Sequence, residues 1–159
     1  MSGKHCRRVR GIYAMLIEIK FPLRFEFRKR EVVLAPGLYV YVGSAKGAGG
    51  IRARVARHRR KDKKVRWHVD LVTVSPHARV SGAVCAKTAE PECILVPLLE
   101  EAGFSHVIKG FGASDCKRGC ASHFLRYEGV GKCSDALLEV FREAGLEPLS
   151  LELEPAQHS

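Results

Sequence analysis

Residues 11–20 read GIYAMLIEIK, and residues 38–43 read LYVYVG. Both runs are apolar and rich in β-branched and aromatic side chains, which favour β-strands. Between them, residues 25–34 alternate bulky with charged side chains, which is the pattern of a half-exposed strand. Pro36-Gly37 marks a turn just before the second run. Together these segments predict an antiparallel meander.

The chain of 159 residues is long enough for one domain with a real core, and its 46% hydrophobic and 28% charged residues are typical of a folded protein. It contains no apolar run near the roughly 18 residues that a membrane span requires, so we expect no membrane association. The basic start MSGKHCRRVRGIY lacks the apolar core of a signal peptide. We therefore expect a cytoplasmic protein with a single domain over residues 1–159.

Positive charge is concentrated in residues 46–66. This segment holds ten lysines and arginines against Asp62 alone, so it carries +9 of the formal net charge of +10. Such a local patch predicts a polyanionic partner rather than a generally basic surface. Nucleic acid fits best, because the segment lacks the broad apolar face of a membrane-binding helix.

The remaining periodicities place helices on both sides of further strands. The small-residue loop SAKGAGG (44–50) leads into a basic helix, and Glu90-Pro91-Glu92 opens a later one. Ser134 is expected to cap the last helix. The fold class is therefore α/β (α+β), with a small, mostly antiparallel sheet of three to five strands flanked by helices. The expected helices cover residues 51–64, 67–72, 90–103 and 134–144, and further strands cover 78–85 and part of 107–127.

The six cysteines are irregularly spaced, which argues against a secreted disulfide framework. Cys85 and Cys93 have apolar neighbours, so we expect both to act as small buried hydrophobic residues.

A second group, Cys116-x3-Cys120-x2-His123, offers three zinc-type ligands. A fourth ligand would have to be His106, Cys133 or a water molecule. A Cys116–Cys120 disulfide and a metal-free reduced loop are the alternatives. If zinc is bound, the chain could instead be a zinc-stabilised interaction domain.

The order of these features resembles the GIY-YIG nuclease superfamily: GIY at residues 11–13, YVG at 41–43, a small-residue loop, an arginine-bearing helix and a glutamate at a later helix start. More narrowly, it is similar to the small archaeal-type Uri lineage. The resemblance covers about residues 11–102, and residues 103–159 resemble only the narrower lineage. The segment between the two tyrosines is longer than in most members. We expect the surplus, RFEFRKREVVLAP (24–36), to form an extra hairpin.

The resemblance implies hydrolysis of phosphodiester bonds with one divalent cation, Mg²⁺ or Mn²⁺. An arginine would bind the phosphate oxygens through its planar fork, and a tyrosine would orient or deprotonate the attacking water. A histidine four residues after the arginine lies on the same helical face. The glutamate would be the metal ligand. The implied catalytic residues are Tyr13, Tyr41, Arg54, His58 and Glu92.

Among the catalytic residues, two assignments stay open in the sequence. Either Tyr13 or Tyr41 could be the base, and Glu90 is a rival to Glu92 as metal ligand. Arg54 is preferred over Arg52, which lies half a turn earlier on the same helix.

The partner is expected to be DNA, with RNA not excluded, and a protein partner or a homodimer is possible. We expect a metal-dependent endonuclease directed by DNA structure or backbone; the alternative is a non-catalytic nucleic-acid-binding module using the basic helix 51–64. Gly43 would let a phosphate approach the strand end, and the basic residues would hold the DNA backbone. The expected nucleic-acid-binding residues are Gly43, Lys46, Arg52, Arg57, Arg59, Arg60, Lys61, Lys63 and Lys64.

Overall fold

A sheet of six antiparallel strands forms the centre of the molecule, in the order β6-β7-β4-β1-β5-β8. The computed structural model describes residues 9–114 and 116–152. The predicted α+β class and antiparallel sheet are confirmed. The sheet is wider than three to five strands because the C-terminal part adds β6 and β7 beside β4, and β8 beside β5. The strands are β1 (Gly11–Ile19), β4 (Gly37–Ala45), β5 (Ala78–Lys87), β6 (Phe104–His106), β7 (Phe124–Tyr127) and β8 (Leu149–Glu152).

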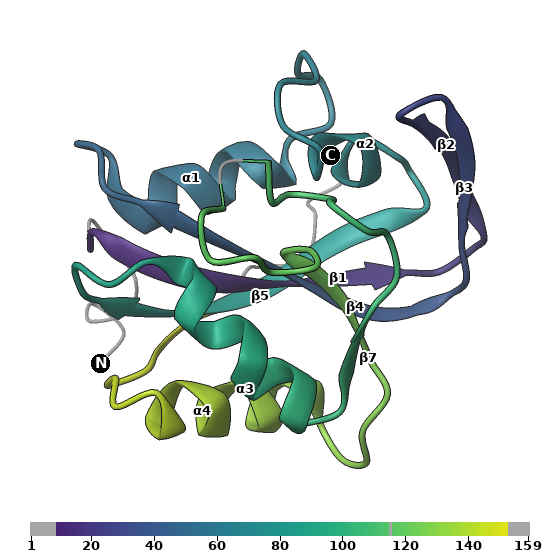
Figure 1. Cartoon of the computed structure of the whole chain (residues 1–159). Coiled ribbons are helices and arrows are strands. Elements are labelled where there is room, and N and C mark those ends of the chain that lie inside the picture. The colour runs from purple at the N-terminus through teal and green to yellow at the C-terminus, as the bar shows by residue number, and fades with distance from the viewer. Residues whose placement is uncertain (1–8, 115, 153–159) are drawn as a thin grey trace.

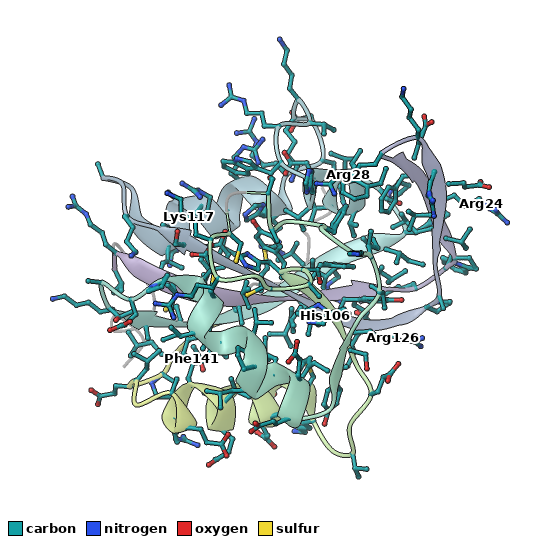
Figure 2. All side chains as sticks on the ribbon, in the orientation of Figure 1. Arg24, Arg28, His106, Lys117, Arg126 and Phe141 are labelled. Atoms are coloured by element: carbon teal, nitrogen blue, oxygen red, sulfur yellow. The ribbon has the colours of Figure 1, made fainter. Side chains whose placement is uncertain are left out.

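Helices cover both faces of this sheet (Figure 1). Alternate side chains of β1 enter two separate cores, as the period of two in a strand requires. Tyr13 and Met15 pack under α1 and α2, whereas Ile12 and Ala14 pack against α3 and α4. Phe141 of α4 is fully buried in the second core (Figure 2). The helices are α1 (Gly50–Arg59), α2 (Asp70–Thr73), α3 (Leu95–Glu101) and α4 (Cys133–Glu143), and the 3₁₀ turn η2 (Glu92–Ile94) precedes α3.

The bounds of the predicted helices need correction. The helix predicted over 67–72 is α2, which begins at Asp70, and the one predicted over 90–103 is the turn η2 followed by α3. The basic helix ends at Arg59 rather than at residue 64. Lys63 turns back and donates its Nζ to the carbonyl oxygens of Arg57 and His58, at 3.2 and 2.6 Å, which satisfies carbonyls at the helix end. The last helix begins at Cys133 after Lys132 and has no side-chain cap, so the predicted capping role of Ser134 is wrong.

The surplus between the tyrosines forms the predicted hairpin, β2 (Leu23–Phe27) and β3 (Arg30–Leu34), as a separate two-stranded sheet. Arg28 and Lys29 make its two-residue turn with positive φ angles of 53° and 66°. The hairpin projects from one end of the main sheet (Figure 1). Because the extra residues leave the sheet, β1 and β4 stay in register, with Tyr13 opposite Gly43 and Met15 opposite Tyr41.

Strands β6, β7 and β8 all follow residue 102, yet each pairs within the main sheet. The C-terminal extension is therefore part of the same sheet as the core. Within the described residues, none of the helices combines the length and the apolar character needed to cross a bilayer.

Candidate active site and metal centre

A pocket of about 190 Å³ opens beside the end of β4. Three of the predicted catalytic residues line it: Tyr41 from β4, Arg54 from α1 and Glu92 from η2. Tyr13 and His58 lie behind it, almost fully buried. The complete lining is Tyr41, Gly43, Ser44, Arg54, Arg66, Trp67, His68, Glu92, Gly112, Ser114, Cys116 and His123.

Gly43 brings the two tyrosines together. A Cβ at this position would lie 2.6 Å from the Tyr13 hydroxyl oxygen and 3.1 Å from Cε2 of Tyr41. The ring centroids of the tyrosines are 6.3 Å apart. Gly43 lines the pocket, as its predicted role beside a phosphate requires. The absence of a side chain also makes room for the two tyrosines, which the strand pattern alone did not indicate.

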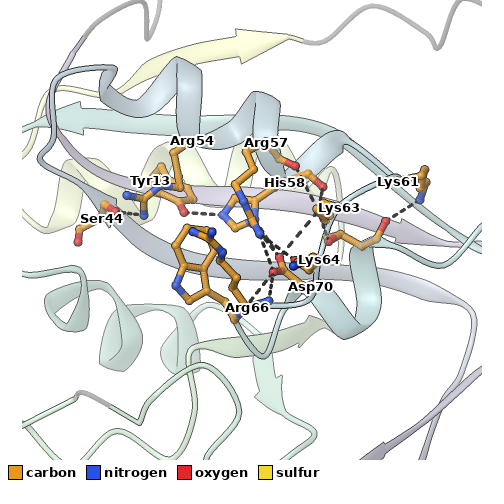
Figure 3. Close-up of polar contacts among 12 residues, drawn as sticks. Tyr13, Ser44, Arg54, Arg57, His58, Lys61, Lys63, Lys64, Arg66 and Asp70 are labelled. Carbon is orange, nitrogen blue, oxygen red and sulfur yellow. Dashed lines mark hydrogen bonds and ion pairs between the residues drawn. The ribbon is translucent and has the colours of Figure 1, made fainter.

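Tyr13 and His58 form a buried neutral pair. The Tyr13 hydroxyl lies 2.9 Å from His58 Nε2 (Figure 3). Burial lowers the pKa of His58 to about 3, and burial, with the neighbouring Tyr41, raises the pKa of Tyr13 well above its usual value. The Asp70 carboxylate faces Nδ1, which favours the neutral tautomer with its proton on Nδ1; in that tautomer Nε2 accepts the hydrogen bond from the Tyr13 hydroxyl. Within the described residues Nδ1 has no hydrogen-bond partner, and Asp70 Oδ1 is 3.9 Å away.

Tyr41 is also protonated at neutral pH. Burial, followed by the charge of Glu92, raises the pKa of its hydroxyl to about 12, although Arg54 acts in the opposite direction. Within the protein alone Tyr41 is thus a hydrogen-bond donor. It could become a base only if additional positive charge lowered its pKa.

Arg54 is held in place at the pocket wall. Its Nη1 donates a hydrogen bond of 3.0 Å to the carbonyl oxygen of Ser44, and its guanidinium lies 4.7 Å from the centre of the Trp67 ring. Arg52 is exposed and does not line the pocket. The structure therefore places Arg54, and not Arg52, beside Tyr41 and Glu92.

Asp70 anchors the back of the site, a role that the sequence did not reveal. Its buried carboxylate accepts two hydrogen bonds of 3.0 Å from the Arg57 guanidinium and backbone N–H bonds from Arg66 and Trp67, at 2.8 and 3.1 Å (Figure 3). Burial alone would raise the pKa of Asp70, but these hydrogen bonds outweigh burial and hold the pKa below its usual value. Arg57 also lies over Trp67, 4.4 Å from the ring centre, so Asp70 fixes a wall of the pocket.

A thiol cluster borders the same pocket. The ligand atoms of Cys93, Cys116, Cys120 and His123 all lie within 4.8 Å of one another, which makes the four residues a possible metal-binding site. Cys93 is buried, as expected, and its thiol is also one of these four groups.

The other candidates for the fourth ligand are engaged elsewhere. His106 contacts Ser122 Oγ at 2.5 Å and Glu100 Oε2 at 2.7 Å. Cys133 is buried in the core beneath α3 and α4, and it is not part of the group of four. Cys116 and Cys120 are free thiols, so no disulfide joins them. Cys85 is buried as expected, but it is disulfide-bonded.

Comparison with known families matches residues 12–146 to a family described as a domain of unknown function, DUF123. The chain belongs to the DUF123 family. The match includes every pocket residue and all four members of the thiol cluster. Neither the curated proteins nor the solved structures contain a significant match to it.

Three of the basic residues expected at a nucleic-acid surface of this DUF123 domain bind the protein itself. Arg57 is paired with Asp70, and Lys63 caps α1 and donates to Thr73 Oγ1 at 2.8 Å. Lys61 donates its Nζ to the carbonyl oxygens of Thr73, Ser75 and Ala78 (2.6–2.8 Å). These contacts give all three side chains a structural role, which a charge count cannot distinguish from phosphate binding.

Other basic side chains remain available at the surface of the DUF123 domain. Arg52, Arg60 and Lys64 are exposed, although Arg60 lies 3.7 Å from the exposed Asp62. Lys46, in contrast, donates long hydrogen bonds of 3.3 and 3.4 Å to the backbone carbonyls of residues 89 and 90. Arg66 is exposed and lines the pocket, although it was not among the predicted site residues.

The sequence did not indicate Trp67, His68 or Asp70 as functional residues, because it predicts only a helix over residues 67–72. Trp67 and His68 line the pocket, and Asp70 binds Arg57 behind it. A useful signal was present: an acidic residue next to the most basic segment is a candidate partner for one of its arginines.

We expect the stability of the DUF123 domain to fall as the pH is lowered from about 7 to 5. The pKa of His58 is lowered to about 3, whereas an unfolded histidine titrates near 6.5, so in this window the unfolded state binds the additional proton. Stability contributed by the neutral imidazole is complete above about pH 6.5 and decreases below it, by at most ~1.4 kcal/mol per pH unit.

Urea denaturation of the wild type and His58→Gln across this range measures the effect. The variant should have a flatter dependence on pH, while His68, whose pKa is also lowered by burial, contributes equally to both proteins. Parallel curves for the two proteins would contradict the assignment.

Proposed function

We propose that this DUF123 domain is a nuclease of the GIY-YIG type, similar to the Uri lineage, which hydrolyses DNA phosphodiester bonds with a divalent cation. One observation carries the proposal: Tyr41, Arg54 and Glu92, from three separate elements, line a single pocket. The order of these residues in the chain matches the superfamily's order, which supports the same reaction.

Glu92 fits the role of metal ligand. Its side chain is 24% exposed and lines the pocket, so a carboxylate oxygen can reach an ion there. Oxygen ligands suit Mg²⁺ and Mn²⁺. Such an ion would neutralise charge on the phosphate and favour deprotonation of the attacking water. Glu90 is exposed and does not line the pocket, which favours Glu92.

Side chains of the protein would bind the phosphate and orient the attacking water. The planar fork of Arg54 would bind two oxygens of the scissile phosphate, for which a lysine is less suited. Tyr41 faces the pocket and would orient the attacking water through its hydroxyl. Tyr13 is 1% exposed and bonded to His58, so it would position Tyr41 and the strand end rather than touch the substrate.

Exposed basic residues of the segment 46–66 would hold DNA by its backbone. Arg52, Arg60, Lys64 and Arg66 offer contacts to phosphates, which orient a duplex without reading its sequence. Recognition would therefore depend on DNA structure rather than on base sequence.

The test is incubation of the full chain with labelled duplex, flapped, branched and single-stranded DNA, and with matching RNA, in Mg²⁺, Mn²⁺ or EDTA. We expect cleavage of at least one DNA substrate with either metal and none in EDTA. Binding of every substrate without cleavage would favour the alternative, a nucleic-acid-binding module. Cleavage that persists in EDTA would contradict the assigned role of Glu92.

We expect Tyr41→Phe to lower the cleavage rate by about tenfold, because the loss of one hydrogen bond to the reacting water is worth ~1.4 kcal/mol. Single-turnover kinetics measures this rate. Tyr39→Phe is the matched control: its hydroxyl donates to the Ala35 carbonyl at 2.6 Å and its ring stacks on Phe124, outside the pocket. A Tyr41→Phe enzyme as fast as the control would remove Tyr41 from the mechanism.

A further inference from the structure

We propose that Cys93, Cys116, Cys120 and His123 bind one zinc ion, and that this ion positions Glu92 and one wall of the catalytic pocket. The second half of this inference rests on the proposed function, since it concerns the residue that would bind the divalent cation. The first half does not.

The four groups have the composition and spacing of a structural zinc site. Cys93 Sγ lies 3.2 Å from Cys116 Sγ and 3.6 Å from His123 Nε2. A tetrahedral zinc ion with bonds of ~2.3 Å to sulfur separates its ligand atoms by roughly 3.8 Å, so small movements would suffice. Three thiolates and one imidazole make a Cys₃His set, which selects a soft ion over Mg²⁺ or Mn²⁺.

The loop that carries three of the four ligands would be stabilised by a bound ion. Between β6 and β7, the described part of residues 107–123 contains no helix or strand, a length at which loops in compact domains are uncommon. Three of its glycines, Gly110, Gly112 and Gly119, have positive φ angles of 84°, 76° and 79°. A metal that joins Cys116, Cys120 and His123 would hold this loop closed. Figure 1 shows the loop crossing the sheet on the side of α1.

The same loop forms the pocket wall. Gly112, Ser114, Cys116 and His123 all line the pocket. Gly112 lies against Tyr41: a Cβ there would be 3.0 Å from Cε1 of the tyrosine ring. The backbone of His123 is also joined to the catalytic strand, because its carbonyl oxygen accepts the Val42 N–H at 2.9 Å. Ordering this loop therefore orders the surroundings of Tyr41.

Two structural connections join the cluster to Glu92. Cys93 is the next residue along the chain, in the same 3₁₀ turn, so a bond from Cys93 to the ion fixes the backbone that carries Glu92. His123 provides the second route: its Nε2 faces Cys93, while its Nδ1 lies 3.6 Å from Glu92 Oε2. If Nε2 binds the ion, the proton of the neutral ring is on Nδ1 and points toward the Glu92 carboxylate. Carboxylates in this position commonly orient metal-binding histidines.

Metal analysis of the full chain, purified in reducing buffer without chelator, tests the first half. We expect about one equivalent of zinc per chain, and less than about 0.2 equivalents in Cys116→Ser and Cys120→Ser. Cys133→Ala, which changes a buried cysteine outside the cluster, should retain zinc. If the serine variants do not fold, cobalt substitution of the wild type tests the site instead. We expect the absorption bands of tetrahedral cobalt bound by thiolates. The absence of these bands together with sub-stoichiometric zinc would overturn the site.

The single tryptophan tests the second half without DNA. Trp67 lines the same pocket as Glu92, so Mn²⁺ bound there should quench its fluorescence. We expect Mn²⁺ to bind at least about tenfold more weakly after zinc is removed with a thiol-specific reagent and chelator and the thiols are reduced again. Glu92→Gln should weaken Mn²⁺ binding and abolish the difference between zinc-loaded and zinc-free protein, whereas Glu90→Gln should leave both unchanged.

Equal Mn²⁺ affinity with and without zinc would overturn the positioning role. Failure of the two proposals can be told apart. Stoichiometric zinc and zinc-dependent Mn²⁺ binding without any DNA cleavage would refute the nuclease and support the zinc site. Metal-dependent cleavage by a chain that binds no zinc would refute the zinc site alone.

Discussion

Arg54→Ala should lower the rate of DNA cleavage by about 10²- to 10³-fold, the usual effect of removing one donor that stabilises charge in the transition state. Arg54 lines the pocket with Tyr41 and Glu92, and its guanidinium is oriented by the Ser44 carbonyl and the Trp67 ring. The lost interaction strengthens as charge gathers on the phosphate, so the rate should fall far more than DNA binding. Single-turnover cleavage and equilibrium binding at one salt concentration separate the two effects.

Arg52→Ala is the matched control for Arg54→Ala, since both arginines belong to α1 but Arg52 is exposed and outside the pocket. It should leave the cleavage rate of bound DNA unchanged. If Arg52 contacts a phosphate, its loss reduces the salt dependence of binding by a slope of about 0.9. Arg54→Lys should recover only part of the rate, because an ammonium keeps the charge but not the fork. Equal losses in the two alanine variants would reduce Arg54 to a binding residue.

The sequence predicted the strands β1 and β4 because the patterns that specify them are local. Apolar β-branched runs specify β1 and β4, and the extra residues between the tyrosines carry their own hairpin pattern. The register that places Tyr13 opposite Gly43 then follows from burial on both faces of the sheet. Arg54 was predicted on another basis, because the resemblance to the GIY-YIG superfamily implied an arginine in the helix after the small-residue loop. These features need no information about distant contacts.

The buried polar groups could not be predicted in the same way. Asp70 lies in an amphipathic segment, and only the fold shows that Arg57, thirteen positions earlier, pairs with it. Cys93 precedes Cys116 by 23 residues, and its neighbours along the chain are apolar, so its thiol was interpreted as packing. The Asp70–Arg57 pair depends on how the chain turns after Arg59, and the Cys93–Cys116 contact depends on how the 107–123 loop folds. Neither of these is visible as a periodic pattern of residues in the sequence.

Asp70→Asn should lower the free energy of unfolding by about 3 to 5 kcal/mol, the usual cost of removing one partner from a buried ion pair. The Asp70 side chain is fully buried, and it satisfies Arg57 and two backbone N–H groups while Lys63 lies 3.8 Å away. An asparagine would offer one acceptor oxygen to this group of donors and leave the cationic charge uncompensated. The melting temperature should fall by about 6 to 20 °C for a chain of this size.

Arg24 lies at the outer side of the β2–β3 hairpin (Figure 2), and its exposed ion pair with Glu31 provides the control for Asp70→Asn. Its atoms are 3.3 Å apart, but both side chains are about two-thirds exposed, at 65% and 66%, so Glu31→Gln should cost less than about 1 kcal/mol. Because the pKa of Asp70 is lowered on folding, its contribution is present near neutral pH and is lost as the pH falls through the folded pKa. The difference in unfolding free energy between wild type and Asp70→Asn should therefore shrink in acid. A variant as stable as Glu31→Gln at neutral pH would show that Asp70 does not support the wall formed by Arg57 and Trp67.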